Sequence, residues 1–120
     1  MREILFRGKD IAGNWHYGVP LVFSEDYVCM TAPHTYNKKV EANTVGQYTG
    51  LPDKNGKKIF EGDICKHRSN YSGEYIISVV TFTDGQFLAM ASENSGFNLS
   101  DKLEIIGNIH DTPELLERSE

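Results

Sequence analysis

Cysteine, long apolar runs and excess positive charge are all scarce in this sequence of 120 residues. Its two cysteines, Cys29 and Cys65, do not form a Cys-x-x-Cys pair, so neither a disulfide framework nor a zinc knuckle is expected. No apolar run reaches the length of about 18 residues that a membrane-spanning helix needs. The first residues return to charge at Arg7, too soon for a signal peptide. We therefore expect a cytoplasmic protein, not a membrane protein, with reduced cysteines.

Residue patterns typical of catalysis or metal binding are also missing. The sequence has four histidines, none in a ligand spacing with another: His16, His34, His67 and His110. It has no nucleophile elbow and no phosphate-binding glycine loop. The acids Asp53, Glu61 and Asp63 lie in glycine-rich turns, where hydrogen bonds to backbone amides explain them better than acid–base catalysis does. We expect no catalytic residues, no metal and no cofactor, and an enzyme with an unrecognised site is the least favoured hypothesis.

The charge balance argues against general binding of phosphate backbones. Twelve Lys and Arg residues stand against seventeen Asp and Glu residues, which gives a formal net charge of −5. A chain without a global basic field does not attract nucleic acid over its whole surface. Hydrophobic residues make up 39% and charged residues 24%, which is typical of a globular domain and not of a disordered chain.

Short turns separating β-rich runs are the most informative feature that the sequence does have. We expect turns at Gly50, Asp53, Asn55, Gly56, Gly62, Asp63, Asp84 and Gly85. Gly56 can supply a positive φ, and the carboxylate of Asp53 can fold back onto the amides that follow it. The pair Asp84-Gly85 is typical of a two-residue type I′ hairpin. The pattern as a whole predicts a small antiparallel β protein.

In the first half, strands are expected at residues 3–8, 15–23, 27–31 and 44–48, and residues 32–43 are expected to form an exposed loop. The cleanest alternation of apolar residues runs along one strand, through Trp15, Tyr17, Val19, Leu21 and Phe23. This pattern predicts that one face of the strand is apolar over its whole length. Pro20 cannot donate a ladder hydrogen bond, so the strand should lie at a sheet edge or contain a bulge.

In the second half, strands are expected at residues 63–67, 74–82, 86–91 and 103–109. Ile76, Ile77, Val79 and Val80 form an almost continuous apolar run, which predicts a strand covered on both faces. Residues 92–100 are rich in Ser and Asn and are expected to form a loop. Thr112 is a suitable N-cap for a short helix over residues 112–117.

Three segments resemble one protein family. The stretch V-G-Q-Y-T-G-L-P-D-K-N-G-K-K-I-F-E-G-D-I, residues 45–64, is similar to the signature of the YopX-like phage and prophage proteins. The opening R-E-I-L-F-R-G-K-D and the close L-E-I-I-G-N-I-H-D-T-P-E-L-L-E agree with the same family and occur in the right order. Two departures are Cys65, where an aliphatic residue is usual, and a poorly matching middle after Tyr17.

The resemblance implies a mainly β fold in which residues 50–120 form a small SH3-like barrel with a short C-terminal helix. Residues 1–49 would then form a β-meander packed with the barrel, either as a separate domain or as part of one continuous domain. The resemblance also implies a phage protein acting in the cytoplasm of a bacterial host. It implies no reaction, because the family has no assigned molecular function.

Two candidate binding surfaces follow. The first is Trp15 and Tyr17, on a strand that would bury aromatic surface against another copy or a partner. The second is the loop over residues 66–71, where His67 and Arg68 combine positive charge with the ring of Tyr71. The alternative for this loop is a solvated connection in which Tyr71 folds over the end of the barrel.

We therefore weigh two main hypotheses. The leading one is a non-enzymatic β module that binds protein or self-assembles, because protein interfaces favour Trp, Tyr and Arg without requiring net charge. The alternative is a nucleic-acid-binding small barrel that acts in phage development. Binding that weakens steeply with salt would distinguish the second from the first.

Overall fold

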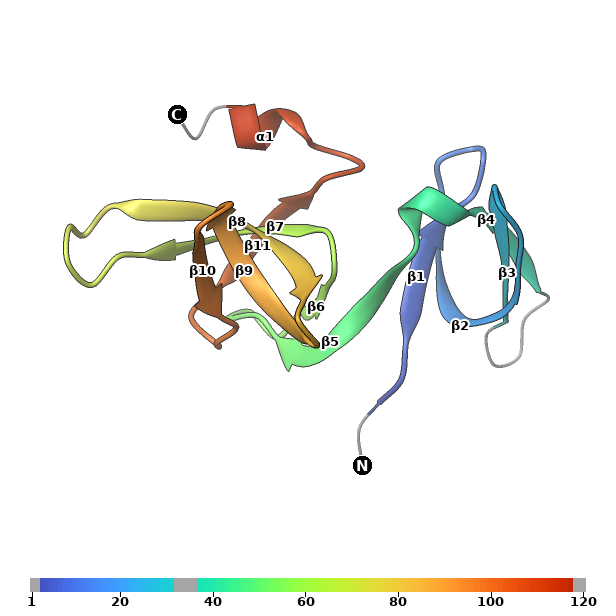
Figure 1. The fold of residues 1–120 in the computed structure, drawn as a ribbon, viewed down its shortest axis with the longest axis horizontal. Helices are drawn as coiled ribbons and strands as arrows, with labels where there is room; N and C mark the ends of the chain where they lie inside the picture. Colours follow the sequence, from blue (N-terminus) through green and yellow to red (C-terminus); the bar gives the residue numbers. More distant parts are fainter. Residues whose placement is uncertain (1–2, 32–36, 118–120) are drawn as a thin grey trace. The chain divides into compact units, whose positions relative to one another are not determined.

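The computed structural model describes residues 3–31 and 37–117, which form a mainly β protein (Figure 1). The chain divides into two compact units, Met1–Gly50 and Leu51–Glu120, and each is described by itself. Each unit has its own cluster of buried apolar residues. Val28, Met30 and Val40 form the cluster of the first unit. The second has Ile59, Cys65, Val80, Ala89 and Leu103.

The first unit contains an antiparallel meander. Its elements are β1 (Phe6–Lys9), β2 (Trp15–Phe23), β3 (Tyr27–Thr31), β4 (Lys38–Glu41), a 3-10 turn (Ala42–Thr44) and the start of β5 (Gly46–Pro52). The strand order of this sheet is β4-β3-β2-β1-β5-β6, where β6 is Lys58–Phe60. A Cβ on Gly8 of β1 would approach a side-chain carbon of Val40 in β4 to 2.6 Å. The meander is thus curled tightly enough that its first and fourth strands meet over the core.

For β2, an edge position or a bulge was expected, and the structure has the bulge. The strand does not lie at an edge, because it pairs with β1 on one side and β3 on the other. Pro20 is accommodated by the predicted alternative, a bulge, since the register with β3 shifts between Pro20 and Val22. Residues 38–41 form β4, not loop, while residues 32–36 and therefore His34 lie outside the described residues.

The bulge also changes which residues of β2 share a face. Before it, Val19 pairs with Thr31, and after it Val22 pairs with Cys29 on the same face. Phe23 pairs with the buried Val28, so it stands on the opposite face from Val19. The expected single apolar face running from Trp15 to Phe23 is therefore wrong, because one inserted residue reverses the alternation.

The second unit is an antiparallel sheet of five strands within the described residues, in the order β10-β9-β8-β7-β11. Its strands are β7 (Asp63–Arg68), β8 (Tyr75–Thr83), β9 (Gln86–Ser92), β10 (Ser95–Asn98) and β11 (Glu104–Asn108). Two edge strands are present in this order, so the described hydrogen bonding does not close a barrel. The strand β10 lies where a loop was expected over residues 92–100.

The central strand β8 is covered largely as its apolar run predicted. Val80 is buried, and Ile76, Ile77 and Val79 are half-buried. The turn into β9 has φ values of 53° at Asp84 and 81° at Gly85, which confirms the type I′ hairpin. The helix α1 (Glu114–Glu117) is a single turn.

Thr112 does not cap α1 in the expected way. Its hydroxyl accepts a hydrogen bond from the Asn108 amide at 3.1 Å and donates one to the Asn108 carbonyl at 3.2 Å. The same side chain lies against Gly107, where a Cβ would collide with it. The hydroxyl therefore ties the C-terminal turn to the end of β11.

Candidate functional site

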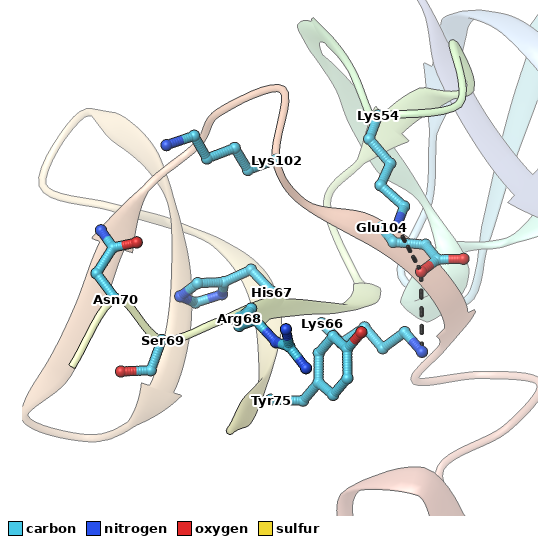
Figure 2. Close-up of a pocket in the computed structure, with 9 residues that line it drawn as sticks. All are labelled: Lys54, Lys66, His67, Arg68, Ser69, Asn70, Tyr75, Lys102 and Glu104. Atoms are coloured by element: carbon cyan, nitrogen blue, oxygen red, sulfur yellow. Dashed lines mark ion pairs between the residues drawn. The ribbon is translucent and has the colours of Figure 1, made fainter. Parts of the chain in front are cut away.

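A groove of about 440 Å³ with many charged lining residues lies at the end of the β7–β8 hairpin in the second unit (Figure 2). Its walls come from three separate stretches of the chain: the β5–β6 turn, the β7–β8 hairpin, and the segment leading into β11. The lining residues are Lys54, Lys66, His67, Arg68, Ser69, Asn70, Tyr75, Lys102 and Glu104. We call this surface the basic groove.

The register of β7 and β8 places a tyrosine among cations. Arg68 pairs with Tyr75, and Lys66, two residues earlier on β7, stands on the same face. The Lys66 ammonium lies 4.7 Å from the centre of the Tyr75 ring and the Arg68 guanidinium carbon lies 5.4 Å from it. These are cation–π distances, so the ring holds both cations near the groove.

A single carboxylate connects two of the lysines. Glu104 of β11 pairs with Lys66 of β7, and its carboxylate lies 3.8 Å from the Lys66 ammonium and 3.4 Å from that of Lys54. Figure 2 shows both ion pairs as dashed lines. These side chains are partly exposed, so each pair adds little to stability, and its effect is to keep the lysines on one side of the groove.

The opposite wall is built around His67, which points to the other face of β7. Its ring meets Phe97 of β10 edge-on, with the ring centres 4.8 Å apart. The following turn is held by the hydroxyl of Ser69, which accepts hydrogen bonds from the amides of Tyr71 and Ser72 at 3.1 and 3.3 Å. This leaves Asn70 and Lys102 exposed on the groove side shown in Figure 2.

The net charge of the groove is opposite in sign to that of the whole chain. Four of its residues are cationic, Lys54, Lys66, Arg68 and Lys102, and one is anionic, which leaves three positive charges with His67 neutral. The chain as a whole carries −5. An anionic ligand therefore meets a local field that the composition does not reveal.

Sequence reasoning found part of this site. His67 and Arg68 line the groove, although both belong to β7 and not to a loop. Tyr71 does not line the groove. Its exposed fraction is 102%, so the expectation that Tyr71 folds over the end of the barrel is wrong. The missed aromatic is Tyr75, which could have been found by pairing the two strands across the turn. Nothing in the sequence pattern indicates Lys54 or Lys102.

The other two predicted binding residues lie on β2 in the first unit. Trp15 is half-buried, and the Arg7 guanidinium carbon lies 4.6 Å from its ring centre, with the Lys9 ammonium at 5.5 Å. Tyr17 is 48% exposed. Beyond it the strand also exposes Val19, Leu21, Val22 and Phe23. Trp15 is therefore held by its own unit, and the exposed apolar surface is further along β2 than predicted.

Comparison with known proteins identifies the family. A family model described as YopX protein matches residues 6–117. The chain belongs to the YopX family. It is also similar to the crystal structure of protein EF1440 from Enterococcus faecalis, with 26% sequence identity and a TM-score of 0.64, over 97% of this chain and 99% of that one. No curated protein matches it.

Two of the three acids of the YopX signature stretch, Asp53 and Asp63, accept hydrogen bonds from backbone amides. The Asp53 carboxylate accepts hydrogen bonds from the amides of Asn55 and Lys57, both at 2.9 Å, and from Ile105 at 3.1 Å. Burial raises the pKa of Asp53, but these three hydrogen bonds outweigh it and leave the pKa below its ordinary value. Asp63 is buried and accepts a hydrogen bond from the Phe60 amide at 2.7 Å.

Gly56 and Gly62 lie in turns, as predicted, with φ values of 85° and 93° that favour glycine. Gly50 also has a positive φ, 91°, but it lies within β5, so the expected turn there is wrong. Gly56 follows Asn55 in the tight turn closed by the hydrogen bond from its own amide to the Asp53 carbonyl, at 3.0 Å. The signature of this YopX chain therefore contains the strands β5 and β6, with turn residues such as Asp53, Gly56 and Gly62 after each of them.

Neither metal nor thiol chemistry is indicated by the described residues. They contain no cluster of three or more His, Cys, Asp or Glu side chains that could hold a metal ion. Both cysteines are free, as expected, and Cys65 is buried. Burial, followed by the charges of Asp63 and Asp53, raises the pKa of Cys65 to about 12, so its thiol is poorly nucleophilic. Among the described helices, none is long and apolar enough to cross a membrane.

Proposed function

We propose that this YopX-family chain is a non-enzymatic phage protein that self-associates in the cytoplasm of its bacterial host. The observation that carries the proposal is a row of exposed side chains on one face of β2. Tyr17, Val19 and Val22 share this face and are 48%, 41% and 62% exposed, and Leu21, at the bulge between them, is 54% exposed. Contiguous apolar surface of this kind, beside polar neighbours, is typical of protein interfaces.

The shape of the strand favours docking through a face and not through an edge. Both sides of β2 are occupied by β1 and β3, so another chain cannot extend the sheet there. The bulge brings Val22 onto the same face as Tyr17 and Val19, which joins the two halves of the exposed row into one surface.

A second copy of the chain is the occupant that best fits this surface. Residues 17–23 contain no charged side chain, so the row itself brings no like charges together when two copies dock. An isologous contact of this type requires a self-complementary patch, and an uncharged apolar strand satisfies that requirement.

The fold of the second unit supports an SH3-like domain as part of the same proposal. Its strands follow the chain from β7 to β10, and the last strand, β11, returns to pair with the first. This order, with a short connection before the final strand, is the one expected for a small barrel of that type. Such barrels act through their surfaces and loops, which agrees with a binding module.

Sedimentation at several protein concentrations tests self-association. The wild-type chain should sediment faster as its concentration rises. Replacing Val19, Leu21 and Val22 with Thr keeps strand-compatible side chains at each position while removing apolar contacts, and it should weaken assembly by about tenfold or more. Ile11→Thr is the matched control, since Ile11 is 83% exposed and lies outside β2.

A wild-type chain that remains monomeric at the highest accessible concentration would overturn the proposal. Equal weakening by the triple variant and by Ile11→Thr would also count against it, because it would show that apolar surface in general, not β2, drives association.

The second candidate function is nucleic-acid binding, and the observation that favours it is the basic groove. This second function does not depend on the exposed row of β2 or on self-association.

A further inference from the structure

The basic groove concentrates the positive charge of an acidic protein into one small concave surface. Lys54, Lys66, Arg68 and Lys102 converge on about 440 Å³, with Glu104 as the one carboxylate among the lining residues. These cations come from three separate stretches of the chain, and Lys66 and Arg68 are held by Tyr75. Cations fixed in a concave site act on an anion more strongly than the same charges spread over a flat surface.

Exposed aromatic rings accompany these charges. Tyr75 lines the groove and is 56% exposed, and Tyr71, four residues earlier in the hairpin turn, is fully exposed. Both tyrosines lie at the tip of the β7–β8 hairpin. On one side of this hairpin β11 pairs with β7 only as far as Lys66, and on the other side β9 pairs with β8 only from Val79. Among the described residues, no further strand pairs with the tip itself. A ligand can therefore reach both rings from the solvent.

We propose that the basic groove binds single-stranded nucleic acid, with its cations on the phosphates and the tyrosines stacked against bases. Positive grooves lined with aromatic rings are the general means by which proteins hold single strands without sequence preference. Exposed rings serve this ligand specifically, because bases that are not paired offer their flat faces for stacking.

Two other polyanions fit the same residues less well. A duplex keeps its bases stacked on one another, so the tyrosines would contribute little. An acidic peptide would gain from bidentate arginine contacts, but Arg68 is the single arginine among the lining residues and the other cations are lysines, which act as point charges.

In this proposal each cation contacts a different part of the bound nucleic acid. Arg68 is exposed and near Tyr75, so it can contact the phosphate beside a stacked base. Lys102 lies across the groove and contacts the neighbouring phosphate. Lys54 and Lys66 share Glu104, and a phosphate would compete with that carboxylate for them.

Fluorescence anisotropy with the full chain tests this directly. The probe is a labelled oligothymidylate of about twelve nucleotides, compared with a duplex of the same length and with a polyglutamate peptide. Three or four phosphate contacts predict that a fourfold rise in salt weakens binding of the single strand by about 20–50-fold. The duplex and the peptide should bind much more weakly.

Variants distinguish binding by the basic groove from a general effect of the net charge of the protein. The double variant Arg68→Gln with Lys102→Gln should weaken binding at least tenfold and flatten the salt dependence. Tyr75→Leu should weaken binding about tenfold with the salt dependence unchanged, since it removes stacking and no charge. Lys38→Gln with Lys39→Gln is the control, because it removes the same charge from β4 and should leave affinity within about twofold.

A titration of the wild-type chain followed by NMR keeps the test independent of variant folding. Amide shifts should concentrate at residues 54, 66–71, 75 and 102. The proposal is overturned if the oligothymidylate does not bind at low salt, or if it binds with shifts elsewhere in the chain. Preference for polyglutamate, or equal losses in the groove and control variants, would overturn it as well.

Discussion

At the scale of single residues, two of the three acids in the signature turns accept hydrogen bonds from backbone amides. Asp53 accepts them from Asn55, Lys57 and Ile105, and Asp63 accepts one from Phe60. In the first unit, Asp10 accepts a hydrogen bond from the His16 ring at 2.7 Å and from the Asn14 amide at 2.9 Å. These contacts lower the pKa of Asp10 to about 2. Each of these acids organises a turn.

Removing the Asp53 carboxylate should therefore cost stability. The residue is 3% exposed, and Asp53→Ala leaves three amides without their acceptor. We expect a loss of about 1–3 kcal/mol in the free energy of unfolding, measured by urea titration. Asp101→Ala is the matched control: Asp101 is exposed in a turn, and its loss should cost under about 0.5 kcal/mol.

The contribution of Asp53 should also depend on pH in a defined direction. Its pKa is lower in the folded state than its ordinary value of about 3.9, so its stabilisation is complete above that value. It is lost as the pH falls through the lower, folded-state pKa. The stability difference between wild type and Asp53→Ala should shrink on acidification below about pH 4. A difference that grows on acidification would contradict this account.

At the scale of elements, turns and bulges determine what each strand presents. One inserted residue after Pro20 moves Val22 to the face of Val19, and a type I′ turn at Asp84-Gly85 sets the pairing of Thr83 with Gln86. The residues that share a face after the bulge could not be predicted from the sequence, because the position of a bulge depends on the partner strand. The type I′ turn could be predicted, because Asp84 and Gly85 have the required backbone preference.

Gly85 provides a clean test at this scale. Its φ is 81°, and a Cβ added there would have no atom within 4 Å, so substitution strains the backbone and crowds nothing. Gly85→Val should lower the free energy of unfolding by about 1 kcal/mol or more in urea. Gly85→Asn should cost clearly less, since asparagine tolerates this conformation. Equal stability of Gly85→Val and wild type would show that the hairpin does not need a positive φ there.

At the scale of the whole molecule, the described residues contain two separate apolar cores. Val40 belongs to the first, and Val80 to the second. Each core is surrounded by strands of its own unit. Units with separate cores can open independently, and hydrogen exchange measures this.

Val40→Ala should open the first unit selectively. Deleting the two methyl groups of a fully buried side chain should cost about 2 kcal/mol. Mass-spectrometric hydrogen exchange should then be faster in β2 and β3, with protection in β7, β8 and β9 unchanged. Val80→Ala should produce the reverse pattern. Equal acceleration in both units by either variant would mean that the chain unfolds as one cooperative body.

The sequence by itself determined the β class, the family and the turns. These features depend on local chemistry: alternation of apolar residues, positive-φ glycines and short polar side chains that bind nearby amides. For this reason the turn roles of Asp53, Gly56 and Gly85 follow from the residues beside them in the chain. Arg68 and His67 could be found in the same way, as part of a charged and aromatic cluster within one short segment.

Only the tertiary structure decided which strands are neighbours and which side chains meet. The central position of β2 depends on the pairing of β1 and β3 with its two sides. The strand β10 lies in a polar segment without apolar alternation, so its pairing with β9 could not be predicted. The basic groove brings Lys54 and Lys102 to Tyr75 from positions far apart in the chain. Such convergence follows from strand register, which is set by long-range pairing and core packing, and no local pattern in the sequence records it.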